Sequence, residues 1–258
     1  MIDTSNIQKI WHTQRGCIKR FLCKMAVDQL ATGRYMKRMR FWPSDKCPRC
    51  LAPNETTLHV LTCPDPEATA LFSQQLQKLL DNLNNYPTKP ELLHDIRALY
   101  TTFHDGLTKV QCATESARAQ TILPLHEFVR GRIVTTWCTE QDQFLQRIRA
   151  RRSANCWVQM LIHEIWQLFF SLWLHQNEAY HSDPKIQNQI HQLSRINREI
   201  RRQWAIGTHG LPQADRHHFT HIKLAQLLKK TLHYKQTWLQ AVTQARQSKH
   251  QTDAPFRS

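Results

Sequence analysis

Glycine is scarce in this chain, and its scarcity restricts the folds that the chain can adopt. Only 6 of the 258 residues are glycine, whereas about 7% is usual in soluble proteins. A many-stranded β protein needs glycine in its tight turns, and a phosphate-binding loop needs it where the backbone approaches the ligand. Both are therefore excluded. With 41% hydrophobic residues, among them 8 Trp and 10 Phe, the chain can nevertheless bury a sizeable core.

Apolar residues recur every three or four positions along most of the chain, which is the period of an amphipathic helix. The predicted helices include 66–84, 88–103 and 154–180. Thr88 and Glu91 have the spacing of a capping box at the second of these. Asp183-Pro184 predicts a further helix start, and Gly207 is placed to end that helix. No run has the period of a strand, so the predicted fold class is all-α, a multi-helix bundle.

The most apolar stretch, from Trp157 to Leu174, is predicted to be a buried helix rather than a membrane span. It contains His163 and Glu164, and charged residues are costly at the centre of a bilayer. Residues 1–6 lack a basic stretch followed by an apolar run, so no secretory signal is predicted. We expect an intracellular protein, nuclear or cytoplasmic and not secreted, that has no membrane partner and no small-molecule substrate.

The sharpest chemical signal is the pattern C-x2-C-x8-H-x3-C, formed by Cys47, Cys50, His59 and Cys63. A Cys-x2-Cys turn directs two thiolates at one point, and a His and a Cys four residues apart share one face of a helical turn. Together they predict one tetrahedral Zn²⁺ ion in a small zinc knuckle near the N-terminus. All four positions are filled by protein, so the ion is expected to be structural rather than catalytic. The alternative is three ordinary buried thiols and a surface histidine.

This segment resembles the zinc-binding segment downstream of the polymerase domain in reverse transcriptases of non-LTR retrotransposons. The family pattern has a Cys pair, a Glu-Thr pair, a His and a Cys, and it is met by Cys47, Cys50, Glu55, Thr56, His59 and Cys63. A second similarity is to a W-x-x-R-N-x-x-x-H helix end. Trp173, Asn177 and His181 match it, and Gln176 stands at the arginine position. The resemblance implies a zinc-binding piece of a retroelement polyprotein.

The sequence lacks the carboxylate motifs that a polymerase or a ribonuclease H would need. A polymerase holds two metal ions with paired carboxylates, and no Asp-Asp pair occurs in the chain. A ribonuclease H would need several carboxylates on a scaffold of strands, and neither is visible. The chain is predicted not to be an enzyme, and to correspond to a part of such a polyprotein without the polymerase domain.

Positive charge suggests a nucleic-acid partner. The net charge is +15, and residues 1–50 contain 11 Lys or Arg against 3 acidic residues. The predicted contact residues are Arg34, Lys37, Arg38, Arg40 and Arg49. Arginine and lysine that alternate with aromatic residues are typical of RNA-binding and DNA-binding surfaces. We expect the helix before the knuckle to lie along the phosphate backbone, with Arg49 in the zinc turn.

The predicted organisation has three segments: a basic helix plus knuckle at 1–64, a helical core domain at 65–182, and basic C-terminal helices at 183–258. The predicted function is a non-catalytic, zinc-binding, nucleic-acid-binding protein. The alternative is a helical protein–protein interaction scaffold derived from a retroelement. Two further clusters, His175/Glu178/His181 and His217/His218/His221, have metal-compatible spacing but are expected to be polar surface.

Overall fold

The computed structural model describes residues 1–42, 44–182 and 184–252. In these residues the chain forms fourteen α-helices and one short 3-10 helix, and no strand. A single backbone bridge joins Ile2 to Val134. The predicted all-α fold class, with the Cys-Cys-His-Cys cluster near the N-terminus, is confirmed.

The chain divides into two compact units. Unit 1 comprises residues 1–35 and 46–179, and unit 2 comprises 36–45 and 180–258. The knuckle therefore belongs to the same compact unit as the helices that follow it in the chain. The predicted segments 1–64, 65–182 and 183–258 stay a prediction.

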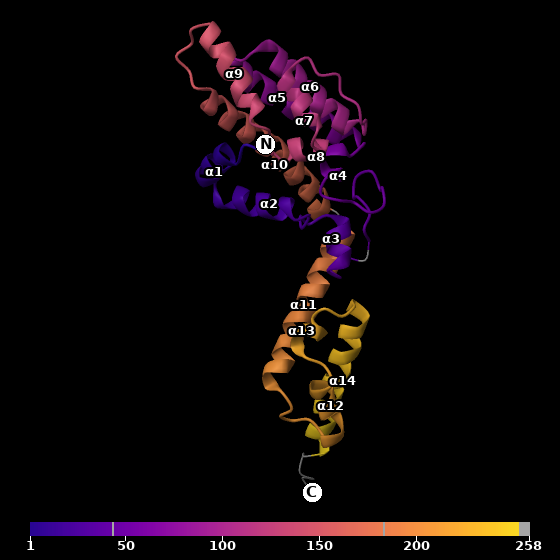
Figure 1. Cartoon of the computed structure of the whole chain (residues 1–258). Helices are drawn as coiled ribbons and strands as arrows, with labels where there is room; N and C mark the ends of the chain where they lie inside the picture. The colour runs from indigo at the N-terminus through magenta and orange to yellow at the C-terminus, as the bar shows by residue number, and fades with distance from the viewer. Residues whose placement is uncertain (43, 183, 253–258) are drawn as a thin grey trace. The chain divides into compact units, whose positions relative to one another are not determined.

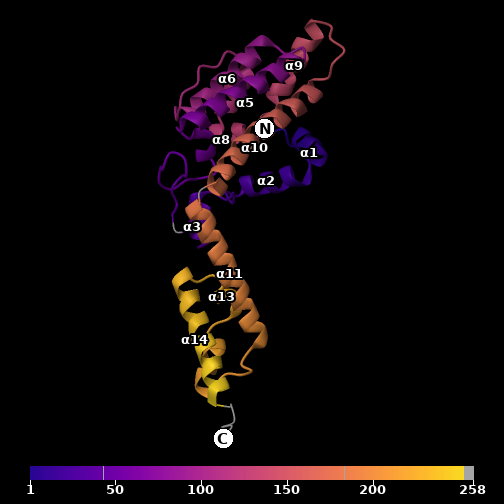
Figure 2. The same cartoon turned by 180° about the vertical axis from the view of Figure 1, so that it is seen from behind.

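Unit 1 contains ten helices within the described residues, two of which, α3 and α10, end in residues that belong to unit 2. They are α1 (Thr4–Thr13), α2 (Gly16–Ala26), α3 (Gly33–Arg38), α4 (His59–Thr62), α5 (Pro66–Asn84), α6 (Pro90–His104), α7 (Glu115–Thr121), α8 (Leu125–Val129), α9 (Thr136–Arg147) and α10 (Ala154–Ser182). Helices α5 and α6 lie side by side, and α7 packs on α6 and α9 (Figures 1 and 2).

The core of unit 1 is built around α10. Within α10 Trp157, Leu161 and Phe169 are fully buried, as expected for a helix that is apolar on most faces. Aromatic rings extend the core in a row of neighbours, 5.6 to 6.5 Å apart, from Tyr100 through Phe128 and Trp137 to Trp157. No helix in the described part of the chain is both long and apolar enough to cross a membrane.

The predicted start of the second helix was wrong in detail. Helix α6 begins at Pro90, behind Lys89, and no side chain caps it. Proline favours the first helical position because its ring presets φ and it has no N–H to leave unpaired. Thr88 instead donates to the Leu83 carbonyl at 2.6 Å and accepts from Trp157 Nε1 at 2.8 Å. Thr88 thus links the end of α5 to the core.

Unit 2 is a helical hairpin with short helices between its arms. It contains α11 (Pro184–Ile206), η1 (Gln213–Arg216), α12 (His217–Thr220), α13 (Leu224–Leu227) and α14 (Leu232–Thr252). Helices α11 and α14 lie side by side in both views (Figures 1 and 2). Ile196, Ile200, Trp238 and Val242 are buried between them in a core of their own.

Gly207 follows α11 with φ +64°, and its N–H bonds the Gln203 carbonyl at 3.2 Å. The predicted helix end is therefore confirmed, because glycine adopts this left-handed conformation without strain. The predicted start residue Asp183 lies outside the described residues.

Candidate metal centre

The four predicted ligands converge in unit 1. Their ligand atoms all lie within 4.8 Å of one another. Cys47 and Cys50 lie in a turn closed by the Leu51 N–H on the Cys47 carbonyl at 3.1 Å, with Leu51 at φ +60°. His59 begins α4, and Cys63 follows the last residue of that helix. A turn and one helical turn, both local structures, therefore present all four side chains to one point.

The separations suit a tetrahedral ion. Metal–sulfur bonds of about 2.3 Å at tetrahedral angles place two sulfurs about 3.8 Å apart, and a sulfur and an imidazole nitrogen about 3.5 Å apart. Cys47 Sγ and Cys63 Sγ are 3.8 Å apart, and Cys50 Sγ lies 3.3 Å from His59 Nε2. The cluster therefore fits a bound metal ion with no position left open for another ligand.

The thiols of Cys47 and Cys63 lie close enough to shift each other's pKa. Hydrogen bonding to the Cys63 thiol holds the pKa of Cys47 far below its ordinary value. The same contact, followed by burial, raises the pKa of Cys63, while the positive charge of Arg49 opposes that rise. Burial raises the pKa of Cys50. Metal binding must therefore displace protons from Cys50 and Cys63, because the raised pKa of each favours its neutral thiol.

Arg49 lies beside these ligands rather than on the outer surface. Its Nη1 donates to His175 Nδ1 at 2.6 Å, and its Nε and Nη2 atoms are buried without a hydrogen-bond partner. A divalent ion with three thiolate ligands carries one net negative charge, which this guanidinium offsets. Arg49 is thus partly buried, whereas the other four predicted contact residues are exposed.

Glu55 joins the knuckle to α3 and α10. Its side chain is fully buried, and its Oε2 accepts from the Gly33 N–H at 2.6 Å. Gln176 Nε2 on α10 donates to Glu55 Oε1, and it also lies 3.6 Å from Cys47 Sγ. The two segments that carry the family resemblance therefore contact each other, through a neutral amide at the family's arginine position.

The side chains of the two weaker histidine clusters do not converge on a common point in the described structure. Within residues 1–42, 44–182 and 184–252, no other group of three metal-ligating side chains converges. His175 is held by Arg49. The rings of His217 and His218 lie 4.1 Å apart, but His217 Nδ1 bonds the Ala214 carbonyl at 2.6 Å.

The remaining predicted basic residues, Arg34, Lys37, Arg38 and Arg40, are all exposed. The boundary between the units falls inside α3, so Arg34 belongs to unit 1 and the other three to unit 2. Lys37 pairs with Asp45 at 2.9 Å, and Arg40 donates to the Lys229 carbonyl at 3.2 Å.

A second set of basic residues was not singled out from the sequence. Arg195, Arg198 and Arg202 are exposed on α11, and their spacing of three and four residues aligns them on one face of the helix. Ile196 and Ile200 are buried on the opposite face. The sequence does contain the pattern that predicts this basic face, because the arginines fall at helical positions different from those of the apolar residues.

Comparison of the chain with protein-family models, with curated proteins and with solved structures finds no match.

Proposed function

We propose that this chain is a non-catalytic protein that carries one structural Zn²⁺ ion and binds a strand of RNA or DNA through unit 2. We also propose that it corresponds to the C-terminal region of a non-LTR retrotransposon reverse transcriptase polyprotein. Three sulfurs and one imidazole form a donor set that zinc prefers, and a closed set of four protein ligands is typical of structural zinc. Cys47, Cys50, His59 and Cys63 would hold the ion, which would stabilise the knuckle.

The observation that carries the nucleic-acid proposal is the segregation of charge. The residues of unit 2 include 16 Lys or Arg and 5 Asp or Glu. On α11 the arginine row has a single acidic neighbour, Glu199, whose carboxylate lies 3.7 Å from the Arg202 guanidinium. A row of exposed arginines on a stable helix neutralises successive phosphates, which supplies most of the affinity of non-specific binding.

Replacing Arg195, Arg198 and Arg202 with alanine is expected to weaken binding and its dependence on salt. Each phosphate contact on a single strand contributes about 0.7 to the slope of log affinity against log salt, so the slope should flatten by about 2. Alanine preserves the helix. The measurement is fluorescence anisotropy with a short single-stranded RNA and its DNA equivalent over a series of salt concentrations.

The matched control removes three charges from unit 1, by Lys9→Ala, Lys24→Ala and Lys78→Ala, all at exposed positions. It should retain the wild-type slope. Equal slopes for wild type and the arginine variant would instead favour the interaction scaffold.

The chain alone is expected to show no DNA synthesis, strand cleavage or ribonuclease activity. A centre closed by four protein ligands has no position for an activated water, and the sequence offers no paired carboxylates for two Mg²⁺ ions. Primer-extension and nuclease assays with Mg²⁺ or Mn²⁺ test this. A metal-dependent activity lost on substitution of one Asp or Glu would contradict the proposal.

A further inference from the structure

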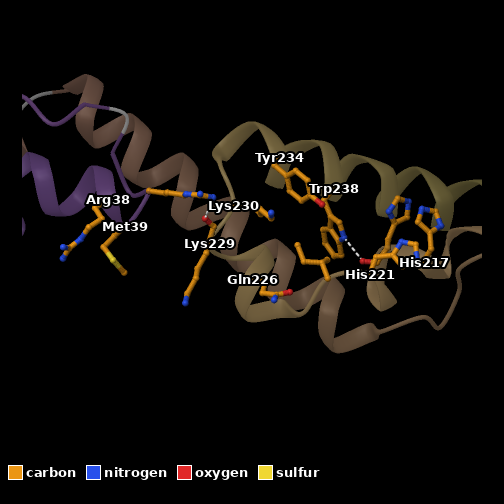
Figure 3. Close-up of a pocket in the computed structure, with 12 residues that line it drawn as sticks. Arg38, Met39, His217, His221, Gln226, Lys229, Lys230, Tyr234 and Trp238 are labelled. Carbon is orange, nitrogen blue, oxygen red and sulfur yellow. Dashed lines mark hydrogen bonds between the residues drawn. The ribbon is translucent and has the colours of Figure 1, made fainter.

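Unit 2 contains a basic cavity of about 670 Å³, a volume within the range of ligand sites. Its lining comes from residues 38–40, from α12 and from the segment that runs through α13 into α14. In Figure 3, Arg38 and Met39 lie at one end of the cavity and His217 and His221 at the other. None of the described residues that line it is acidic.

Permanent positive charge is concentrated at one end of the cavity. Arg38, Arg40, Lys229 and Lys230 all line it. The bond from Arg40 Nη1 to the Lys229 carbonyl, at 3.2 Å, holds residues 38–40 against the turn between α13 and α14. Two segments that are almost 190 residues apart in the chain thereby contribute to one cationic site, and cations gathered in a concave site bind phosphate more strongly than the same cations dispersed over a surface.

Three imidazoles line the other end. The rings of His217 and His221 lie 5.6 Å apart, and His218 is adjacent to both. Burial, and after it the positive charge of His217, lowers the pKa of His218. An anion bound in the cavity would oppose both effects, because it stabilises the protonated imidazoles.

An aromatic surface completes the cavity. Tyr234 is 44% exposed, and Lys230 Nζ lies 5.4 Å from the centre of its ring. Trp238 is buried and donates from Nε1 to the His218 carbonyl at 3.0 Å (Figure 3). Trp238 therefore supports the cavity wall, while the ring of Tyr234 is accessible for stacking on an unpaired base.

We propose that this cavity binds one nucleotide unit of a single-stranded nucleic acid, with its phosphate among the lysine, arginine and histidine side chains and its base against Tyr234. This rests on the proposed function, because it places part of the strand that unit 2 binds. A polycationic cavity next to an exposed tyrosine suits a phosphate joined to an aromatic base, whereas an acidic peptide offers the charge without the base.

The test is the variant Lys229→Ala/Lys230→Ala, compared with Lys24→Ala/Lys78→Ala, which removes the same charge from exposed positions of unit 1. With a short oligouridylate as the probe, the cavity variant should lower the slope of log affinity against log salt by about 1.4, and the control should leave it unchanged. Photocrosslinking of an oligouridylate that contains 4-thiouracil should label the segment 217–234 in the wild type.

The outcomes separate this inference from the proposed function. If the wild type shows no salt-dependent binding at all, both fail. If the wild type binds but the cavity variant keeps its slope, or the crosslinks lie elsewhere, the cavity assignment alone is overturned. Competition by uridine 5′-monophosphate as effective as by the strand would replace the strand with a free nucleotide, and equal competition by polyglutamate would replace it with an acidic peptide.

A pH series tests the histidine end. Protonated imidazoles attract phosphate, so binding should tighten as the pH falls from about 8 to about 6. His217→Gln/His218→Gln/His221→Gln should lose most of that gain, and an undiminished gain would overturn the assignment. Asp215 is the acidic group next to these rings, and it raises the pKa of His218. The other titratable or charged groups of the cavity are Arg38, Arg40, Lys229, Lys230 and Tyr234, which line the same cavity.

Discussion

Substituting any one of Cys47, Cys50, His59 and Cys63 is expected to release the metal and unfold the knuckle. In small zinc-binding peptides the metal contributes about 10–16 kcal/mol to folding, because the ligand set forms only in the folded state. The cluster around the ligands is small, since it consists of Cys47, Cys63 and Ala68 with Cys50 packed against them. The large core of unit 1, to which Val60 and Leu61 of α4 also belong, holds the other helices together, so those helices should persist.

Elemental analysis of protein purified without chelator, together with limited proteolysis at 46–63, measures this effect. Cys112→Ser is the matched control, because Cys112 is a partly buried cysteine outside the cluster. The wild type and the control should contain close to one equivalent of zinc, and Cys47→Ser should contain almost none. Zinc at about half an equivalent or less in the wild type, or cobalt or iron in its place, would contradict the zinc proposal.

Glu55→Ala is expected to give the second-largest loss. It leaves the Gly33 N–H and Gln176 Nε2 buried without their acceptor, and each such donor costs about 1–3 kcal/mol, so the free energy of unfolding should fall by about 2–6 kcal/mol. Gln176 also lies against Cys47 Sγ. Zinc affinity should therefore fall by about 10–100-fold, as is usual when groups that orient a metal ligand are removed.

Asp95→Ala is the matched control for Glu55. Asp95 is a fully buried carboxylate that accepts from the Ala113 and Thr114 N–H groups at 2.9 and 2.8 Å. Its loss should destabilise the helical core by a similar amount and leave zinc affinity unchanged. Denaturant unfolding and competition with a zinc chelator measure the two quantities. Equal zinc affinities for Glu55→Ala and wild type would show that Glu55 only supports the fold.

Short-range patterns predicted much of the fold and the ligand set. The helix over 66–84 was predicted from its period, and α5 has those bounds, with Asp65 accepting from the Ala68 N–H at 3.0 Å. The four ligands were predictable for the same reason, since a Cys-x2-Cys turn and one turn of helix determine their positions locally. Thr88 was misassigned because its true partners, Leu83 and Trp157, are chosen by packing and not by the spacing of a capping box.

The sequence alone therefore determined the helical class, the bounds of α5 and the four candidate metal ligands, because hydrophobic period and turn chemistry act over a few residues. Only the tertiary structure decided what surrounds those features. It brought Arg49 to His175, Gln176 to Glu55, and Arg40 to the Lys229 carbonyl. The partners in these contacts are 121 to 189 residues apart in the chain. The sequence around a charged residue does not show which distant residue the packing of the helices will place beside it.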